Sequence, residues 1–202
     1  MSKILFASNN PGKLREAKAI LEPYGFVIIS PESLGIDLEV AETGLTYLEN
    51  ATLKAKAFYF AANIPCIADD SGLEVEALQG APGVFSHRFA GSVTKTDAER
   101  CQYLLEKLRP FSRPWKAAFH CYAVFYDGVE TKHSHGICEG EIVEEAKGSQ
   151  GFGYDPIFRL EGYPLTMAEA GEDLKNRVSH RADALKKLIP FLNAYFHLQP
   201  CL

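Results

Sequence analysis

The sequence lacks the cysteine spacing that marks disulfide-rich and zinc-binding proteins. Its five cysteines are odd in number and widely spaced, and no Cys-x-x-Cys pair occurs in the 202 residues. Structural zinc sites and small disulfide scaffolds both depend on closely spaced cysteines, so neither class fits this chain. We interpret the five thiols as buried or incidental side chains in a reducing compartment.

Membrane-length apolar runs and an excess of basic residues are also missing. No stretch is long enough to cross a bilayer and the N-terminal residues lack a signal-peptide pattern, so we expect a cytoplasmic protein without a membrane partner. The formal net charge is −5, whereas proteins that bind long phosphate backbones cluster Lys and Arg. We therefore expect no polymeric nucleic acid partner.

The composition is that of an ordinary globular protein without repeats or low-complexity segments. Hydrophobic residues make up 47% of the chain and charged residues 23%. This balance suits one domain over residues 1–202 that can bury a sizeable core.

Hydrophobic spacing predicts an α/β fold. A strand, a helix and a second strand are expected over 3–7, 14–21 and 26–30, which is typical of a parallel unit. Two Thr-x-x-Glu capping boxes predict helices from 46 to about 62 and from 96 to about 108. Further along, the pattern predicts an antiparallel meander and a closing helix: strands over 116–126, 130–135 and 140–145, a turn at Asp127-Gly128, and a helix over 179–196 that Pro190 kinks or interrupts. A mixed sheet with a second lobe fits this order.

The most informative motif is Asp69-Asp70-Ser71-Gly72, which follows the apolar run 64–68. We interpret it as the end of a buried strand that emerges into a turn. Neighbouring strand residues point to opposite faces, so we expect one carboxylate to act while the other braces it. A carboxylate here suits a hard divalent cation or a general base, although an Asx turn favours the same residue types.

A second motif, Ser8-x-Asn10-x-x-Lys13, lies where the first predicted strand meets the first helix. Helix N-termini attract anions, and these side chains can donate to phosphate oxygens. The Gly-x-x-x-x-Gly-Lys spacing of a Walker loop is absent. The motif therefore indicates a phosphate site of another kind, with ordinary helix capping as the alternative.

Acidic residues gather before and at the start of the long helix, at Glu39, Glu42 and Glu49. They could supply further ligands to a metal beside Asp70, because Mg²⁺ takes one or two carboxylates together with phosphate oxygens and water. Solvated or capping glutamates are the alternative.

The glycine-rich loop 148–156 carries two aromatic residues, Phe152 and Tyr154. Such a loop can place a ring beside a planar base, although the rings could equally cover the core. Donors also lie in Lys175 and in Ser179-His180-Arg181, where a helix cap and a surface charge are the alternative.

Taken in order, six motifs resemble those of the inosine triphosphate pyrophosphatase family. They span residues 8 to 181 and are Ser8-x-Asn10-x-x-Lys13, Glu42-Thr43-Gly44, Ala68 to Leu73, Gly80-Ala81-Pro82-Gly83, Gly151 to Pro156 and Ser179-His180-Arg181. The resemblance implies a nucleoside triphosphate pyrophosphohydrolase that converts ITP, dITP, XTP and dXTP to the monophosphate and pyrophosphate, and so cleanses the nucleotide pool. It also implies an elongated mixed sheet with flanking helices, two lobes around a central cleft, and a homodimer.

The resemblance further assigns a Mg²⁺ cofactor and the site residues. Glu42 and Asp70 would bind the metal, and Asp70 would also accept the proton of the attacking water, although the sequence does not decide between Asp69 and Asp70 as the base. The residues that would bind substrate are Ser8, Asn10 and Lys13 for the triphosphate, Lys54 and Ser71 for phosphate and sugar, and Phe152, Gly153, Tyr154, Asp155, Lys175, His180 and Arg181 for the base.

Two other functions stay open. A pyrophosphatase for modified pyrimidine nucleotides would share the phosphate and metal residues but need a different base pocket. A non-catalytic purine nucleotide-binding module would need the loop 148–156 but not the many acids around Asp70.

Overall fold

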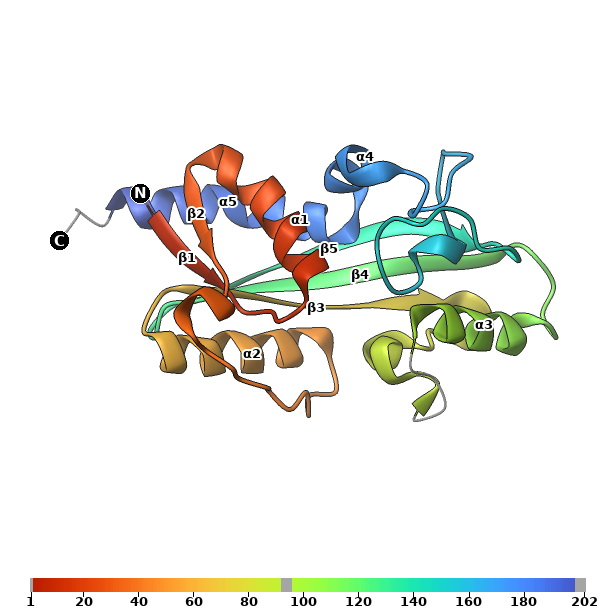
Figure 1. The fold of residues 1–202 in the computed structure, drawn as a ribbon, viewed down its shortest axis with the longest axis horizontal. Helices are drawn as coiled ribbons and strands as arrows, with labels where there is room; N and C mark the ends of the chain where they lie inside the picture. Colours follow the sequence, from red (N-terminus) through yellow and green to blue (C-terminus); the bar gives the residue numbers. More distant parts are fainter. Residues whose placement is uncertain (1, 92–95, 199–202) are drawn as a thin grey trace. The chain divides into compact units, whose positions relative to one another are not determined.

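The computed structural model describes residues 2–91 and 96–198, which form a mixed α/β fold (Figure 1). The strands are β1 (Ser2–Phe6), β2 (Phe26–Ile29), β3 (Cys66–Val75), β4 (Trp115–Tyr126), β5 (Thr131–Ile142) and β6 (Phe158–Leu160). They form one sheet in the order β2-β1-β3-β4-β5-β6. β1 is parallel to β2 and β3, whereas β5 and β6 are antiparallel. The prediction of a mixed sheet with flanking helices is confirmed.

Five α-helices accompany the sheet in the described residues. They are α1 (Pro11–Leu21), α2 (Tyr47–Ala62), α3 (Asp97–Leu108), α4 (Gly171–Val178) and α5 (His180–Leu198). Both predicted capping boxes form, since Thr46 and Glu49 open α2 and Thr96 and Glu99 open α3. Among the helices described, none has the length and apolar character needed to cross a bilayer.

The described chain divides into two compact units. The first comprises the described residues of Met1–Asp70, Cys121–Gly136 and His180–Leu202, and the second comprises those of Ser71–His120 and Ile137–Ser179. The strands β3, β4 and β5 each contribute residues to both units, so the chain crosses between them within strands.

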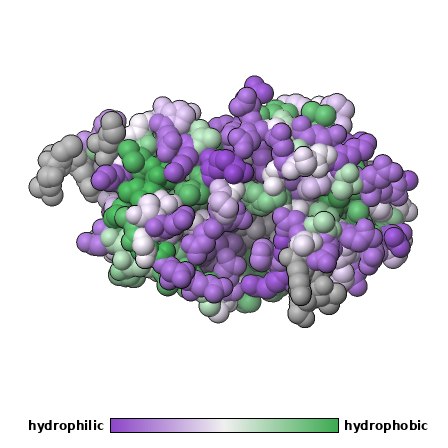
Figure 2. Space-filling view, viewed as in Figure 1, coloured by the Kyte–Doolittle hydropathy of each residue, from purple (hydrophilic) through white to green (hydrophobic). Residues whose placement is uncertain are grey.

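In the first unit, helices cover both faces of the sheet. Ile4 and Phe6 of β1 pack in a core with α1 and α5, whereas Leu5 packs in a second core with α2 (Figure 1). Strands buried on both faces have nearly continuous apolar sequences, which explains the run at the N-terminus. Figure 2 shows hydrophobic residues gathered over β1 and β2, where the edge strand β2 leaves Val27 and Ile29 partly exposed.

In the second unit, β4 has one face in the core. Trp115, Ala117 and Phe119 pack in a core to which α3 also contributes, whereas Lys116 and His120 line a cavity. This is the alternation of side chains that a strand with one buried face shows.

Two sequence predictions about the strands are wrong in detail. Asp69-Asp70-Ser71-Gly72 does not turn, because β3 continues through it to Val75. The strands predicted over 130–135 and 140–145 are one strand, β5. It passes through Gly136, where a Cβ would lie 2.1 Å from the His180 carbonyl oxygen, so this glycine permits close packing rather than a turn.

The closing helix and the segment before it also differ from the prediction. The predicted interruption at Pro190 is wrong, because α5 continues through this residue, and Leu188 and Leu192 on either side of it are buried in the core. The alternative, a kink at Pro190, stays a prediction. Helix α4 was not predicted, because its eight residues include only two apolar ones, Leu174 and Val178, besides the first glycine. The end of the chain after Leu198 lies outside the described residues.

Candidate active site

The two aspartates of β3 use opposite faces of the sheet. Asp69 contacts Lys13 of α1 and Arg181 of α5, whereas Asp70 contacts Lys54 of α2. Since β3 is extended at these residues, the division follows from strand geometry. That one carboxylate acts while the other braces it stays a prediction.

Asp69 is at the centre of a buried ionic network. Its Oδ2 lies 3.1 Å from Lys13 Nζ and 3.0 Å from Arg181 Nε, and Arg181 also pairs with Glu16. The side chains of Asp69 and Arg181 are fully buried. Burial would raise the pKa of Asp69, but the ion pairs with Lys13 and Arg181 hold this pKa well below its usual range. Asp69 is therefore a charged structural anchor and a poor proton acceptor.

Asp70 shares a lysine with the acidic loop before α2. Lys54 Nζ lies 2.9 Å from Asp70 Oδ1 and 2.7 Å from Glu42 Oε1. Burial raises the pKa of Asp70 above its ordinary value, although Lys54 opposes the change. The pKa of Lys54 is also raised: burial lowers it, but the charges of Asp70, Asp69 and Glu42 outweigh burial. An aspartate with a raised pKa is the better proton acceptor of the two.

Asn50 links the acidic loop to Asp70. This fully buried amide accepts a hydrogen bond from Gly44 N at 2.8 Å and donates to Asp70 Oδ2 at 3.3 Å. A Cβ on Gly44 would lie 2.7 Å from Asn50 Oδ1, so the loop can approach only as glycine. Asn50 thereby fixes Asp70 and the backbone two residues after Glu42.

The donor set of Glu42 and Asp70 suits a hard divalent cation. Both carboxylates already converge on one positive charge, the Lys54 ammonium. No group of three or more His, Cys, Asp or Glu side chains with metal-binding geometry occurs in the described residues. Two carboxylates are nevertheless what Mg²⁺ uses when phosphate oxygens and water complete its coordination.

In the loop before α1, the side chain of Asn10 caps the helix and the side chain of Ser8 holds Asn10. Asn10 Oδ1 accepts hydrogen bonds from Gly12 N at 2.8 Å and Lys13 N at 3.1 Å, and Ser8 Oγ accepts one from Asn10 N at 3.2 Å. The capping alternative is therefore real for Asn10. These bonds hold the loop so that Lys13 reaches Asp69.

In the second unit, Asp155 organises the glycine-rich loop. Its Oδ2 accepts hydrogen bonds from Phe152 N at 2.9 Å and from Lys175 Nζ at 2.5 Å. The Lys175 ammonium also lies 4.6 Å from the centre of the Phe152 ring. Gly151 has φ +80°, and a Cβ there would lie 2.1 Å from Asp155 Oδ2. An aromatic face, an ammonium and a carboxylate thus meet in one place.

Two other residues of this loop, Tyr154 and Gly153, make hydrogen bonds to other parts of the second unit. Tyr154 is buried, and its hydroxyl donates to the Ser86 carbonyl oxygen at 2.9 Å. This ring therefore covers the core, which is the alternative that the sequence left open for the aromatic residues of the loop. Gly153 N donates to Asp97 Oδ2 at 2.6 Å, which ties the loop to the start of α3.

The predicted site residues fall into two groups. Those in the first unit are Ser8, Asn10, Lys13, Glu42, Lys54, Asp70, His180 and Arg181, and those in the second are Ser71, Phe152, Gly153, Tyr154, Asp155 and Lys175. His180 and Arg181 are buried at the start of α5. The role expected of Arg181, donation to a base, is not supported by its contacts, because its guanidinium is bound to Asp69 and Glu16.

Two residues of the site were not found from the sequence. Glu16 holds Arg181, and Asn50 holds Asp70. Helical spacing offered a signal for both, since Glu16 follows Lys13 by three residues and Asn50 precedes Lys54 by four.

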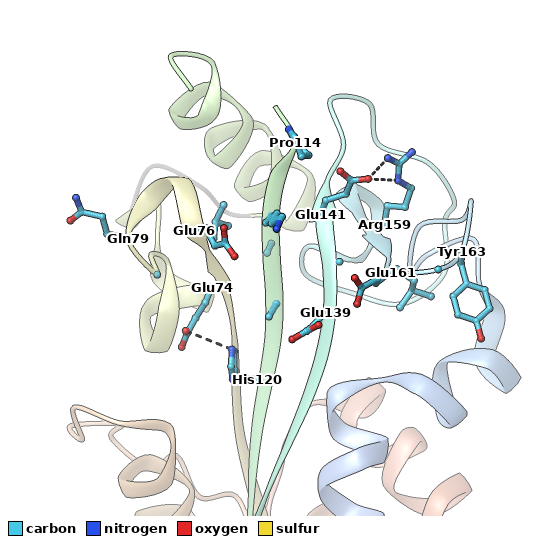
Figure 3. A pocket seen from close by; sticks show the side chains of 18 residues that line it. Glu74, Glu76, Gln79, Pro114, His120, Glu139, Glu141, Arg159, Glu161 and Tyr163 are labelled. Carbon is cyan, nitrogen blue, oxygen red and sulfur yellow. Dashed lines mark hydrogen bonds and ion pairs between the residues drawn. The ribbon is translucent and has the colours of Figure 1, made fainter. Parts of the chain in front are cut away.

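The cavity drawn in Figure 3 does not contain these residues. It has a volume of about 1010 Å³ and is lined only by residues of the second unit, where Glu74 faces His120 and Glu141 pairs with Arg159. The cavity lies on one face of the sheet (Figure 3), and none of the predicted site residues lines it. The chemistry is therefore better located by the carboxylate and lysine clusters than by the size of a cavity.

On this mixed α/β fold, two carboxylates share Lys54 and a third contacts Lys13, an arrangement suited to metal and polyanion chemistry. A model of the Ham1 family matches residues 4–191. The chain belongs to the Ham1 family.

Relatives and solved structures agree with this assignment. The dITP/XTP pyrophosphatase of Bacillus subtilis is 46% identical over 196 residues, which cover 96% of this chain and 98% of that protein. The dITP/XTP pyrophosphatase of Aquifex aeolicus is 46% identical over 198 residues, covering 94% and 96%. The Ham1 protein of Staphylococcus aureus superposes with a TM-score of 0.83 at 40% identity, and a HAM1 protein from Coxiella burnetii with 0.85 at 39%; each match covers 96% of this chain and 100% of the other. The resemblance noted in the sequence is confirmed.

Proposed function

We propose that the chain is a nucleoside triphosphate pyrophosphohydrolase that converts deaminated purine nucleotides such as dITP, ITP and XTP to the monophosphate and pyrophosphate. The observation that carries this proposal is the convergence of Glu42, Asp70 and Lys54. Two acids for a cation and a lysine for phosphate are what cleavage of a highly charged anhydride requires. The names of the relatives described above supply the substrate class.

The proposed cofactor is Mg²⁺, which Glu42 and Asp70 would hold. When bound, the ion would neutralise phosphate charge and polarise a phosphoryl oxygen. Lys13 and Lys54 add positive charge, and the loop of Ser8 and Asn10 would guide the triphosphate to the start of α1. Ser71 is proposed to support the sugar or phosphate.

Asp70 is the proposed base for the attacking water. Burial raises its pKa, whereas the pKa of Asp69 is held low by Lys13 and Arg181. A general base with a pKa closer to neutrality accepts a proton more readily. Asp69 would instead position Lys13, and Arg181 would neutralise Asp69.

The base pocket is proposed to use Phe152, Lys175 and Asp155. Phe152 offers a ring for stacking, and the Lys175 ammonium lies over this ring, 4.6 Å from its centre. A 6-oxo purine offers this ammonium an acceptor, whereas a 6-amino purine offers a donor. Lys175 keeps its ion pair with Asp155 in either case, so the cost of the wrong base is a donor turned toward a donor, and such mismatches discriminate between substrates.

A substrate panel tests the proposal. Purified protein with Mg²⁺ is given dITP, XTP, dATP, dGTP and modified UTP and CTP, and pyrophosphate release is measured. We expect kcat/KM for dITP to exceed that for dATP by roughly 10²-fold or more. A preference for modified pyrimidines would support the alternative pyrophosphatase, and tight dITP binding without pyrophosphate release would support a non-catalytic module.

The proposal extends to the assembly and the cellular location of the protein. A homodimer is proposed from the family resemblance alone, and light scattering after gel filtration would reveal its mass. A cytoplasmic location is proposed from the substrate class, because free nucleotide pools lie there; the four cysteines described are free thiols and buried.

A further inference from the structure

The position of the Lys54 ammonium bears on how the metal enters the site. It contacts Glu42 Oε1 at 2.7 Å and Asp70 Oδ1 at 2.9 Å, and the Lys54 side chain is only 12% exposed. These are the two carboxylates proposed to bind Mg²⁺. The ammonium therefore lies between Glu42 and Asp70, where a metal ion bound to both carboxylates would also lie.

The lysine and the metal cannot both keep these contacts. Mg²⁺ binds carboxylate oxygens at about 2.0–2.1 Å and holds a strict octahedral geometry. An ammonium less than 3 Å from the same oxygens would compete for their lone pairs, and two positive charges at this separation repel strongly in a buried site. One of them has to withdraw.

The surrounding structure allows the lysine to withdraw without loss of the two ligands. Asn50 holds Asp70 through Oδ2 and holds the acidic loop through Gly44 N. Both bonds are independent of Lys54. The lysine stem is long and flexible, whereas Asn50, which holds both Asp70 and the Gly44 amide, is fully buried.

In the metal-free protein, Lys54 compensates the negative charges of Glu42 and Asp70. Glu42 and Asp70 carry like charges, and both contact the same ammonium. Glu42 lies on a loop without regular structure, and its side chain is 31% exposed. Without a cation between them, the two carboxylates would face each other with no compensating charge, which favours their separation.

We propose that Lys54 is a built-in substitute for the metal: it holds Glu42 and Asp70 together in the metal-free protein, and the divalent cation displaces it from both carboxylates. The proposal rests on the proposed function only for the identity of the metal ligands. Once displaced, Lys54 is released to bind the polyphosphate that accompanies the cation.

The first test measures metal binding without nucleotide. Free Mn²⁺ is followed by electron paramagnetic resonance with the wild type, Lys54→Met and a matched control. Lys56→Met, the control, removes an exposed lysine of the same helix. We expect Lys54→Met to bind Mn²⁺ about tenfold more tightly, the equivalent of one charge-assisted hydrogen bond, and Lys56→Met to stay within about twofold of wild type.

The second test needs no substitution and follows the lysine itself. Wild-type protein is labelled by reductive methylation, and the rate at Lys54 is read by mass spectrometry with and without Mg²⁺. We expect labelling of Lys54 to accelerate severalfold as Mg²⁺ saturates the site, while labelling of Lys56 does not change. If Lys54→Met fails to fold, Lys54→Gln and this labelling test still decide the matter.

The outcomes separate this inference from the proposed function. Equal or weaker Mn²⁺ binding by Lys54→Met, an equal gain in Lys56→Met, or unchanged labelling at saturating Mg²⁺ would overturn the substitution idea. None of these measurements depends on turnover. The proposed function fails separately, if the wild type releases no pyrophosphate from dITP.

Discussion

The neighbouring aspartates Asp69 and Asp70 should respond in opposite ways to the same substitution. Asp69→Asn removes the negative charge that faces Lys13 and Arg181, both of which remain positive. Glu16, Asp69, Lys13 and Arg181 together carry no net charge, so the substitution leaves one uncompensated positive charge. Arg181 cannot lose its proton and is fully buried, so this charge stays inside the protein.

The size of the effect follows from the burial. Removing one partner of a buried ion pair costs about 3–5 kcal/mol. The amide oxygen of asparagine can still accept a hydrogen bond, so we expect the lower end, about 3 kcal/mol of unfolding free energy. For a chain of this size that corresponds to a fall in Tm of roughly 6–12 °C.

Asp70→Asn should spare stability and abolish turnover. Because the pKa of Asp70 is raised on folding, its charged form is disfavoured in the native state at neutral pH, and removing the charge should leave Tm equal or higher. Loss of a general base and metal ligand should lower kcat by about 10²–10⁴-fold.

Urea unfolding, thermal unfolding and pyrophosphate release from dITP would be measured on both variants. The exposed pair of Asp183 with Lys187 offers a control, since Asp183→Asn should change the unfolding free energy by less than about 1 kcal/mol. An Asp69→Asn protein as stable as wild type, or an Asp70→Asn protein much less stable, would refute this division of roles.

Three further substitutions test the rest of the site. Gly151→Ala places a Cβ 2.1 Å from Asp155 Oδ2 at a positive φ, so we expect KM for dITP to rise several-fold with kcat less affected; unchanged kinetics would show that the loop tolerates the distortion. Asn50→Ala should weaken Mn²⁺ binding, because Asp70 and the acidic loop lose their shared hydrogen-bond partner; a calorimetric titration that matches wild type would argue against this support. The pKa of Asp97 lies below its ordinary value, since hydrogen bonds from the Gly153 amide and from a neighbouring arginine outweigh partial burial. The stability it contributes is present above about pH 4 and lost as pH falls, so the stability gap between wild type and Asp97→Asn should close below that pH, and a gap independent of pH would contradict it.

Local signals in the sequence located α2 and α3 well. The capping boxes of α2 and α3 depend on residues three apart, and both formed as predicted. The turn predicted at Asp69-Asp70-Ser71-Gly72 was wrong because the local preference of these residues was overridden by β3, which stays in the sheet as far as Val75.

The residues of the site could be proposed from motifs, but their partners could not. Arg181 and Glu16 lie 165 positions apart and Arg181 and Asp69 lie 112 apart, and no local pattern pairs them. The lysine between Glu42 and Asp70 likewise depends on a loop, a helix and a strand meeting in the fold.

The central claim is that Glu42 and Asp70 together bind the metal that serves a deaminated purine nucleotide. A crystal structure with Mn²⁺ and a non-hydrolysable dITP analogue tests it most directly, because anomalous scattering locates the metal unambiguously. We expect one Mn²⁺ coordinated by both carboxylates and by phosphate oxygens, with the Lys54 ammonium on the polyphosphate. A metal bound elsewhere, with Lys54 still on Glu42 and Asp70, would contradict the account.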